Sequence, residues 1–368
     1  MKEGWEYKKL EEICSKGSSN ISLNKIEDNY GEYNLYGASG LVKGIDFYHQ
    51  EIAYIGIVKD GSGVGRVDIY PPKSSLVGTM QYIFPKDGCE IGFLKYLLQG
   101  LHLENYKTGA AIPHIYFKDY GKTKVLLPPL SEQLHIVEEL DLLSSIIEKK
   151  KAQLKELDNL AQSLFYEMFG DPITNEKRWE MKPLGEECTE IKYGTSRPAC
   201  ENGRYKYLRM GNLTLKGSLD LTDLKTIDIP EDEVEKCIVR YGDILFNRTN
   251  SLELIGKTCM FDLDEPMVIA GYIIRVRLSK NLHPRYISIM FNTPRMKLML
   301  KKMAKGAVNQ ANINSKELAS ILTPIPPIEL QNQFASKIEA IQHQKELIKQ
   351  SIKEVETLFN NRMDFYFN

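Results

Sequence analysis

Residues 128–170 read PPLSEQLHIVEELDLLSSIIEKKKAQLKELDNLAQSLFYEMFG, and this stretch decides the fold because residues 326–367 repeat it as PPIELQNQFASKIEAIQHQKELIKQSIKEVETLFNNRMDFYF. Matching positions in the two copies include Pro129 and Pro327, Gln133 and Gln331, Leu140 and Ile338, and Leu143 and Ile341. A shorter match opens the segment before each copy, where Trp5-Glu6 corresponds to Trp179-Glu180. The chain therefore contains one unit twice, each made of a globular segment and a long helix.

Apolar residues in both copies recur at alternating steps of four and three, the spacing typical of a coiled coil. The predicted interface consists of Leu140, Leu143, Ile147, Leu154, Leu157, Leu164, Ile338, Ile341, Ile348, Ile352, Val355 and Phe359. Lys150, Lys345 and Arg362 interrupt the stripes, where they would set the register or lie at wet edges. Because one copy is central and the other C-terminal, we expect antiparallel packing. The alternative is two separate helices, each packed on its own domain.

The ends of these helices carry recognisable signals. Each begins after a Pro-Pro pair, with Ser131 as the expected N-cap of the first helix. Gly170-Asp171-Pro172 ends that helix. The sequence predicts an α+β protein in which two mixed α/β domains (1–127 and 173–325) alternate with two long helical segments (128–172 and 326–368).

Both globular segments combine short strands with helices. Expected strands lie within 33–54, 64–70, 79–84, 207–210, 243–246 and 270–278, and expected helices at 91–99 and 284–305. Apart from their opening and closing landmarks, the two segments differ almost entirely. A shared frame with different contents suggests two readers of different targets.

Composition restricts the class of protein. At 368 residues the chain has room for two or more domains. The N-terminus does not resemble a signal peptide, and no apolar stretch approaches the roughly 20 residues of a membrane helix. Six scattered cysteines without a CxxC pair argue against a zinc site or a disulfide framework. We expect a cytoplasmic protein with no membrane association.

The formal net charge of -1 hides an asymmetry along the chain. Basic residues are in excess in 173–325, whereas the two helical segments are acidic. Nucleic-acid binding needs a positive face rather than a positive total, and the second globular segment could supply one. The alternative is that these charges are distributed by chance and form no binding face.

The order of these motifs is similar to that of a known family. The PPLSEQ helix start, the closing EMFGDP, the opening WE.K.LGE, the GDILFNRTNS segment and the second PPIELQ helix resemble a type I restriction-modification specificity subunit. The C-terminal copy departs from the pattern, because it has PPIELQ and ends without FGDP.

The resemblance implies a function and partners. Two target recognition domains would each bind one half of a bipartite double-stranded DNA site. The helices would form an antiparallel coiled coil that spaces the half-sites and docks two DNA adenine methyltransferase subunits, with restriction subunits as further partners. S-adenosylmethionine would belong to the methyltransferase, ATP and Mg²⁺ to a restriction subunit, and no cofactor to this chain. A specificity subunit of a related fused or type IIB-like enzyme is the alternative within this class.

Side chains suited to DNA contact follow the turns of both globular segments, since cations bind phosphate while amides and guanidinium forks read base edges. In the second segment these candidates are Lys192, Thr195, Arg197, Arg209, Asn212, Asn247, Arg248, Thr249, Lys305, Asn309, Gln310 and Asn312. In the first they are Tyr36, Ser39, Lys59, Ser62, Arg66, Lys107, Thr108 and His114. Each taken singly could instead be a solvated turn residue.

Signals for catalysis are weak. The run KDGSGVGR (59–66) superficially resembles a phosphate loop but lacks the GK[ST] ending, so a glycine-rich hairpin fits better. Leu127 and Ile325 precede the Pro-Pro pairs, which excludes the [DN]PP[YF] loop of adenine methyltransferases. Asp171 with Glu190 and Lys192 could be argued as a nuclease site, and a purely structural coiled-coil adaptor is the second alternative. We expect no catalytic residue and no metal site in this chain.

Overall fold

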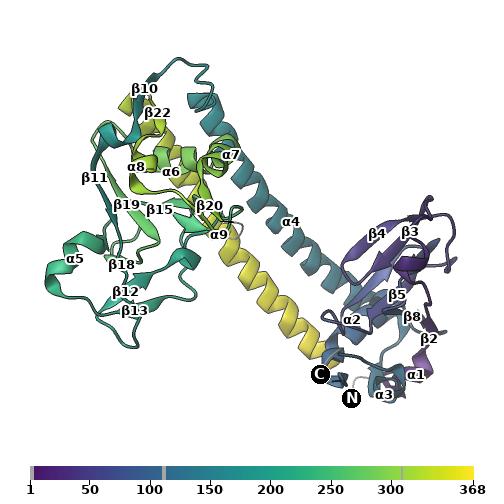
Figure 1. Cartoon of the computed structure of the whole chain (residues 1–368). Coiled ribbons are helices and arrows are strands. Elements are labelled where there is room, and N and C mark those ends of the chain that lie inside the picture. Colours follow the sequence, from purple (N-terminus) through teal and green to yellow (C-terminus); the bar gives the residue numbers. More distant parts are fainter. Residues whose placement is uncertain (1–3, 110–112, 308–309) are drawn as a thin grey trace. The chain divides into compact units, whose positions relative to one another are not determined.

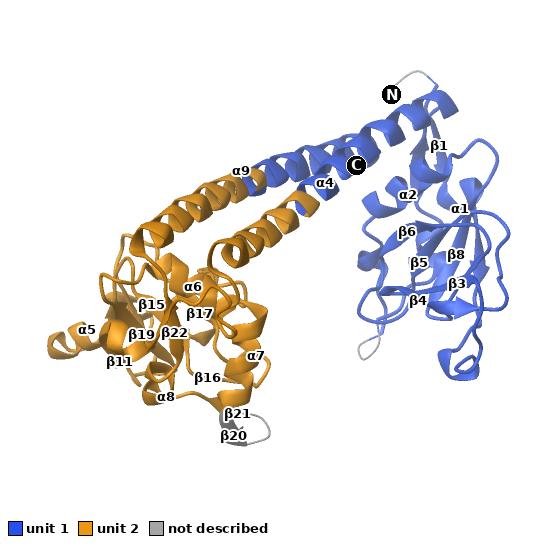
Figure 2. Cartoon of the chain, turned by 90° about the horizontal axis from the view of Figure 1, so that it is seen from above, with its two compact units in different colours: residues 1–151, 349–368 blue, residues 152–348 orange. Residues whose placement is uncertain are grey.

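The computed structural model describes residues 4–109, 113–307 and 310–368. The chain divides into two compact units, which are coloured separately in Figure 2. Unit 1 contains residues 1–151 and 349–368, and unit 2 contains residues 152–348. Each unit therefore combines one globular part with about half of each long helix, so the compact units differ from the four expected segments.

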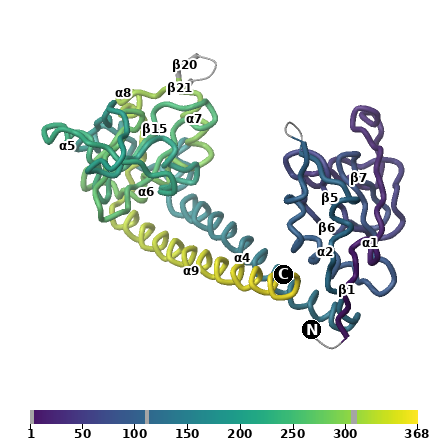
Figure 3. Tube along the Cα trace, turned by 90° about the horizontal axis from the view of Figure 1, so that it is seen from below, coloured from purple at the N-terminus to yellow at the C-terminus, as the bar shows by residue number. Residues whose placement is uncertain are grey.

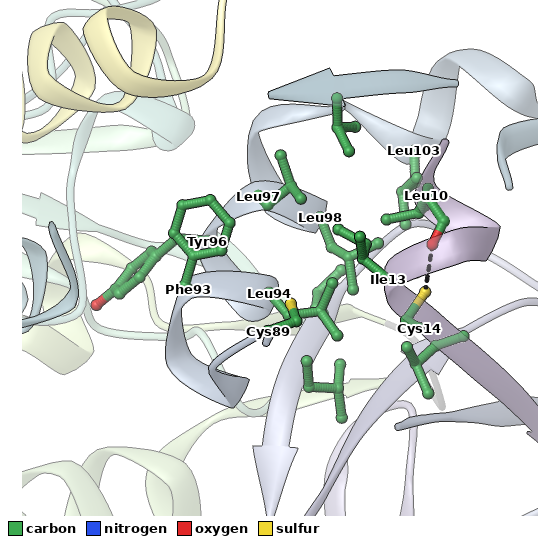
Figure 4. Close-up of a cluster of buried hydrophobic side chains, with 14 of the residues drawn as sticks. Leu10, Ile13, Cys14, Cys89, Phe93, Leu94, Tyr96, Leu97, Leu98 and Leu103 are labelled. Carbon is green, nitrogen blue, oxygen red and sulfur yellow. Dashed lines mark hydrogen bonds between the residues drawn. The ribbon is translucent and has the colours of Figure 1, made fainter. Parts of the chain in front are cut away.

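Unit 1 has a globular part built mainly from three small sheets (Figure 1). One sheet pairs β1 (Glu6–Lys9) with β9 (Lys124–Leu127). The second has the order β2 (Cys14–Ser18), β8 (Met80–Pro85), β5 (Tyr54–Val58) and β6 (Val67–Tyr70), and the third has the order β4 (Gly40–Ile45), β3 (Tyr33–Gly37) and β7 (Ser74–Leu76). Its helices here are α1 (Leu10–Ile13), η1 (Leu23–Lys25), α2 (Ile91–Gly100), η2 (Leu103–Tyr106) and α3 (Phe117–Tyr120). Apolar residues of α1 and α2 fill the core shown in Figure 4.

Unit 2 has a larger globular part with four sheets. The first sheet pairs β10 (Glu180–Pro183) with β22 (Leu322–Ile325), and the second has the order β11 (Cys188–Tyr193), β19 (Ile273–Leu278), β15 (Ile244–Asn247) and β17 (Thr258–Met260). The third sheet has the order β13 (Lys225–Ile227), β12 (Tyr205–Leu208), β18 (Met267–Ile269) and β14 (Ile238–Val239). The fourth has the order β16 (Thr249–Asn250), β21 (Gln310–Asn312) and β20 (Lys305–Ala307). Its helices are η3 (Leu184–Glu187), η4 (Met210–Asn212), α5 (Glu231–Cys237), α6 (Pro284–Asn292), α7 (Pro294–Met303) and α8 (Ser315–Ala319).

The sequence repeat reappears as a repeated backbone frame. In each unit the opening strand pairs antiparallel with the strand that precedes the long helix. Glu6 lies opposite Leu127, and Glu180 opposite Ile325, so equivalent residues of the repeat share one register. The thiols of Cys14 and Cys188 both donate to the carbonyl four residues earlier, and Figure 4 shows the first of these hydrogen bonds. The frame that the two copies share in sequence is therefore also present in the structure.

A buried glutamine joins each long helix to its globular part. The Gln133 amide accepts a hydrogen bond from the Glu90 backbone N–H at 2.8 Å and donates to the carbonyls of Gly88 and Pro128 at 2.8 Å. Gln331 repeats these three bonds with the His283 N–H and the carbonyls of Asn281 and Pro326, at 2.8, 3.0 and 2.8 Å. Both side chains are fully buried. The matching glutamines of the repeat thus perform the same structural task.

The long helices α4 (Leu130–Phe169) and α9 (Ile328–Phe367) pair antiparallel within each unit (Figures 1 and 3). In unit 1, Glu139 of α4 pairs with Arg362 of α9, and Lys151 with Glu356 at 3.3 Å, so residue numbers rise on one helix as they fall on the other. In unit 2, Asp158 pairs with Lys345 and Phe169 packs on Phe334 further along. The expected antiparallel coiled coil is confirmed, and the alternative of two separate helices is wrong.

Most of the predicted stripe lies in the helix seam. Leu140, Leu143, Ile147, Ile338 and Ile352 are buried, while the other predicted interface residues are half-buried. Near the end of α4 the buried positions shift by one residue, because Phe165 and Phe169 are fully buried while Leu164 is only half-buried. The reason is that both phenylalanines pack on Tyr286 of the globular part as well as on Phe334.

Several local expectations need correction. Ser131 is not an N-cap, because α4 already begins at Leu130. The helix expected at 284–305 is broken between α6 and α7, where Pro294 lacks the N–H that a continuous helix needs and Thr293 caps the second helix. Gly170 ends α4 as expected, with a positive φ of 75° that favours glycine. None of the helices in the described part of the chain has a stretch long and apolar enough to cross a membrane.

Candidate nucleic-acid interface

A cleft of about 1080 Å³ opens in the globular part of unit 2, and we call it the unit 2 cleft. Six chain segments meet there: the loop after β11, the chain just after β12, the loop before β13, the β15–β16 turn, the loop before β19, and β21. Six of the predicted residues line it, namely Thr195, Arg197, Arg209, Arg248, Thr249 and Asn312. Residues up to 117 positions apart in the chain thus converge on one surface.

Backbone pairing fixes Arg248 at the floor of this cleft. Its N–H donates to the Tyr272 carbonyl at 3.0 Å, and its carbonyl accepts from the Ile313 N–H at 2.9 Å. The next residue, Thr249, pairs with Asn312 in the β16–β21 ladder. Arg248 is therefore held between two neighbouring segments rather than carried on a free loop.

The cleft arginines have different partners. Arg197 binds both carboxylate oxygens of Glu233, at 2.6 and 3.1 Å, and this hydrogen bonding lowers the pKa of Glu233. Arg209 donates to Asp223 at 2.6 Å, and Asp223 has a lowered pKa because Lys225 and Arg209 both donate to it. Arg248 instead donates from Nε to the neutral amide oxygen of Asn312 at 3.3 Å. Its guanidinium also lies 4.8 Å from the centre of the Tyr193 ring.

Two other candidates of unit 2, Asn247 and Asn212, are buried, and so is Thr195 of the cleft lining. Asn247 is fully buried on β15, and its amide atoms have no hydrogen-bond partner in the described part of the chain. Asn212 is buried, and its amide donates to the Asp220 carbonyl and accepts from the Arg209 N–H, both at 2.8 Å. Thr195 is buried and its hydroxyl accepts from the Arg197 N–H. We leave Asn212 and Asn247 out of the proposed interface, since their positions suit shaping of the loops.

The remaining candidates of this unit lie on β strands or outside the described residues. Lys192 on β11 forms an ion pair with Glu190. Lys305 and Gln310 belong to β20 and β21, which pair antiparallel. Asn309 lies outside the described residues.

Unit 1 has a smaller cleft of about 450 Å³, which we call the unit 1 cleft. Ser39 from the β3–β4 turn and Arg66 from the β5–β6 turn are the predicted residues that line it. Asp68, Tyr70, His102 and Glu104 complete its charged and aromatic lining. Tyr36 packs on Tyr70, with ring centres 4.8 Å apart.

The run from Lys59 to Arg66 forms the turn of a β hairpin, because β5 and β6 pair antiparallel on either side of it. The expectation of a glycine-rich hairpin is confirmed, with positive φ at Gly61 and Gly65. The turn is tied to a second loop, since the Lys59 carbonyl accepts from the Ile115 N–H at 3.0 Å and Asp60 pairs with His114. Thr108 exchanges backbone hydrogen bonds with His114. Ser62 and Lys107 are exposed at this site.

Some lining residues were missed in the sequence. Tyr272 lines the unit 2 cleft with 51% of its surface accessible, and the Tyr193 ring, outside that lining, supports the guanidinium of Arg248. His102 and Glu104 in the unit 1 cleft follow α2, and no local sequence pattern marks them as lining residues. A tyrosine in an apolar strand is usually a core residue, so only the tertiary structure could show these roles.

The acidic residues considered for a nuclease are engaged elsewhere. Asp171 accepts from the Ile173 N–H at 2.8 Å and pairs with Arg295 at 3.2 Å. Glu190 pairs with Arg275 and with Arg277. Within the described ranges, no three His, Cys, Asp or Glu side chains gather as a metal site.

Comparison with known proteins adds the decisive observation. The family model of the type I restriction modification DNA specificity domain matches residues 2–158 and again residues 176–357. The chain belongs to this specificity-domain family. Each of the two matches covers most of one copy of the internal repeat.

Relatives of this specificity-domain protein include two curated subunits. The EcoKI specificity subunit of Escherichia coli (strain K12) is 25% identical over 285 residues, which are 73% of this chain and 61% of that protein. The MjaVIII specificity subunit of Methanocaldococcus jannaschii is 24% identical over 320 residues, covering 81% of this chain and 74% of that protein. The chain thus spans 61% of the length of the EcoKI subunit.

Solved structures share the fold of this specificity-domain protein. The S subunit of a type I restriction-modification system from M. genitalium aligns with a TM-score of 0.62 and 13% identity, covering 99% of this chain and 96% of that one. A chain from a study of complex assembly and conformational transition in the type I R-M system aligns with a TM-score of 0.59 and 18% identity, covering 100% and 98%.

Proposed function

We propose that this chain is the DNA specificity subunit of a type I restriction-modification complex. Unit 1 binds one half of a bipartite double-stranded DNA site and unit 2 binds the other, each largely through the major groove. The observation that carries this proposal is a repeated frame with unlike clefts: β1–β9 and β10–β22 have equivalent registers, whereas different residues line the two clefts. A molecule of that kind suits a target with two different halves.

The proposal assigns catalysis to partners. The helices α4 and α9 set the spacing of the half-sites and dock two adenine methyltransferase subunits, with restriction subunits joining the complex. This chain binds no cofactor: S-adenosylmethionine belongs to the methyltransferase, and ATP with Mg²⁺ to a restriction subunit. The six free cysteines suit a reducing compartment, so we place the complex in the cytoplasm.

Methylome sequencing tests this function directly. Cells that carry the gene should methylate adenine within a split motif, and deletion of the gene should abolish methylation at every copy of that motif. Complementation with the intact chain should restore it. An unchanged methylome after deletion would contradict the proposal, and DNA cleavage by the purified chain with Mg²⁺ alone would favour a nuclease instead.

A further inference from the structure

Among the arginines of the unit 2 cleft, Arg248 is held so that its terminal donors stay free. Its Nε donates to Asn312, but Nη1 and Nη2 donate to no residue in the described part of the chain. No carboxylate pairs with Arg248 within that part either. The side chain is half-buried, and its guanidinium rests on the face of Tyr193.

The group that holds Arg248 is itself anchored. The Asn312 amide oxygen accepts from Arg248 and from the Thr249 hydroxyl, both at 3.3 Å. Thr249 is buried, and its backbone pairs with Asn312 in the β ladder. Because both the ring and the amide are fixed, the plane of the guanidinium is set before any ligand arrives, which reduces the entropy lost on binding.

The other arginines of the cleft do not offer such a fork. Arg197 uses Nε and Nη2 for its two bonds to Glu233, and Arg209 uses Nη2 for Asp223. To contact DNA, either side chain would first have to leave its carboxylate. These two suit an adjustable phosphate contact, whereas Arg248 suits a rigid contact with a base edge.

We propose that Arg248 reads a guanine in the half-site bound by unit 2, an inference that rests on the proposed function and adds the base. Two parallel N–H donors match the O6 and N7 acceptors that guanine presents in the major groove. Adenine offers N7 but places an N–H₂ donor where O6 would be, so one donor of the fork would meet another donor. Arg248 is therefore the specificity-determining residue for that position.

A selection experiment on the full chain, assembled with the methyltransferase subunits of its own cells, tests the inference. Split duplexes with randomised half-sites are enriched on the wild type, Arg248→Ala, Arg248→Lys and, as control, Arg204→Ala. Arg204 is exposed, pairs with Glu231 and does not line the cleft. The wild type and the control should select the same motif, and Arg248→Ala should select it with one guanine relaxed to any base.

Replacement of that guanine by 7-deazaguanine, which lacks the N7 acceptor, gives a second readout. Affinity of the wild type should fall about fivefold, in line with the loss of one bond of a bidentate pair. Arg248→Ala should bind the natural and modified duplexes equally. The inference would be overturned if the half-site bound by unit 2 contained no guanine on either strand. It would also be overturned if Arg248→Ala weakened binding to all sequences equally. If the wild type selects no split motif at all, the proposed function itself fails.

Discussion

At the scale of single residues, two carboxylates form ion pairs with arginines of the unit 2 cleft. Glu233 of α5 binds Arg197, and Asp223 binds Arg209. In free protein these pairs neutralise groups that would otherwise attract any phosphate. Within the proposed function, they would limit non-specific DNA binding and favour sites where enough contacts form to displace the carboxylates.

Glu233→Gln should therefore strengthen non-specific DNA binding. The freed Arg197 would neutralise one more phosphate, so the slope of log K against log salt should steepen by roughly one. Titration of random-sequence duplex across a salt series measures the slope. Glu265→Gln is the matched control, because it frees Lys206, which does not line the cleft, with the same change in net charge. Equal steepening in both variants would show a net-charge effect only.

A buried ion pair makes the stability of unit 2 depend on pH. Burial opposes ionisation of Glu190, but the hydrogen bond from Lys192 and the charges of Arg275 and Arg277 outweigh it and hold its pKa below the usual range. A carboxylate with a depressed folded-state pKa stabilises the fold above its unfolded pKa, and this contribution is lost as pH falls through the folded value. Arg275 is fully buried, so it depends on this partner.

Glu190→Gln should lower the free energy of unfolding of unit 2 by about 3 kcal/mol at neutral pH, because it removes the carboxylate that pairs with a buried guanidinium. Denaturant unfolding at pH 7 and in steps to below pH 4 measures the difference. The gap between wild type and variant should narrow as the pH drops below about 4.5. Glu201→Gln, at an exposed loop position, should show neither effect. A constant gap at all pH values would contradict the assignment to charge.

At the scale of elements, the buried glutamines fix the start of each long helix to its globular part. Gln133 and Gln331 each satisfy one N–H and two carbonyls that have no place in a helix or strand ladder. Leucine has a similar volume but no polar atoms, so it would leave all three backbone groups unpaired. The glutamines are thus junction residues rather than surface residues of the helices.

Gln133→Leu should destabilise unit 1 by about 3 kcal/mol, since each buried unpaired group costs about 1–3 kcal/mol and relaxation recovers part of the loss. Hydrogen exchange should accelerate at 86–100 and 128–133 while unit 2 stays unchanged. The exposed Gln153 of α4 supplies the control variant Gln153→Leu. Unchanged protection around Glu90 would show that the three bonds do not hold the junction.

At the scale of the whole molecule, α4 and α9 each contribute to both units, and antiparallel ion pairs recur along their seam. Lys345 and Arg362, which interrupt the apolar stripe, pair with Asp158 and Glu139 of the other helix. Such polar positions specify one register, because a shift would leave each charge facing apolar side chains. These ion pairs therefore favour a single register of the two helices, and within the proposed function such a register would set the spacing of the half-sites.

Insertion of one heptad after Lys151 and another after Ile348 should preserve the stripe and lengthen each helix by about 10.5 Å. At about 3.4 Å per base pair, the spacer of the methylated motif should grow by about three base pairs with both half-sites unchanged. Methylome sequencing of cells with the altered gene reads the spacing. Four residues inserted in α4 alone should break the pairing and abolish methylation. An unaltered spacer after both heptads would refute the spacer role.

The sequence by itself determined the tandem order, the two long helices and the antiparallel seam, because a repeat and a 3.5-residue period are local and persist whatever the domains contain. It also gave the hairpin at Lys59–Arg66 and the helix end at Gly170, since glycine conformations are local too. The tertiary structure decided which polar residues face a cleft. Asn247 and Arg248 are neighbours, yet one is buried on β15 and the other lines the unit 2 cleft. It also decided which arginines are neutralised, because Glu233 and Asp223 lie far along the chain from Arg197 and Arg209, and only folding brings those charges together.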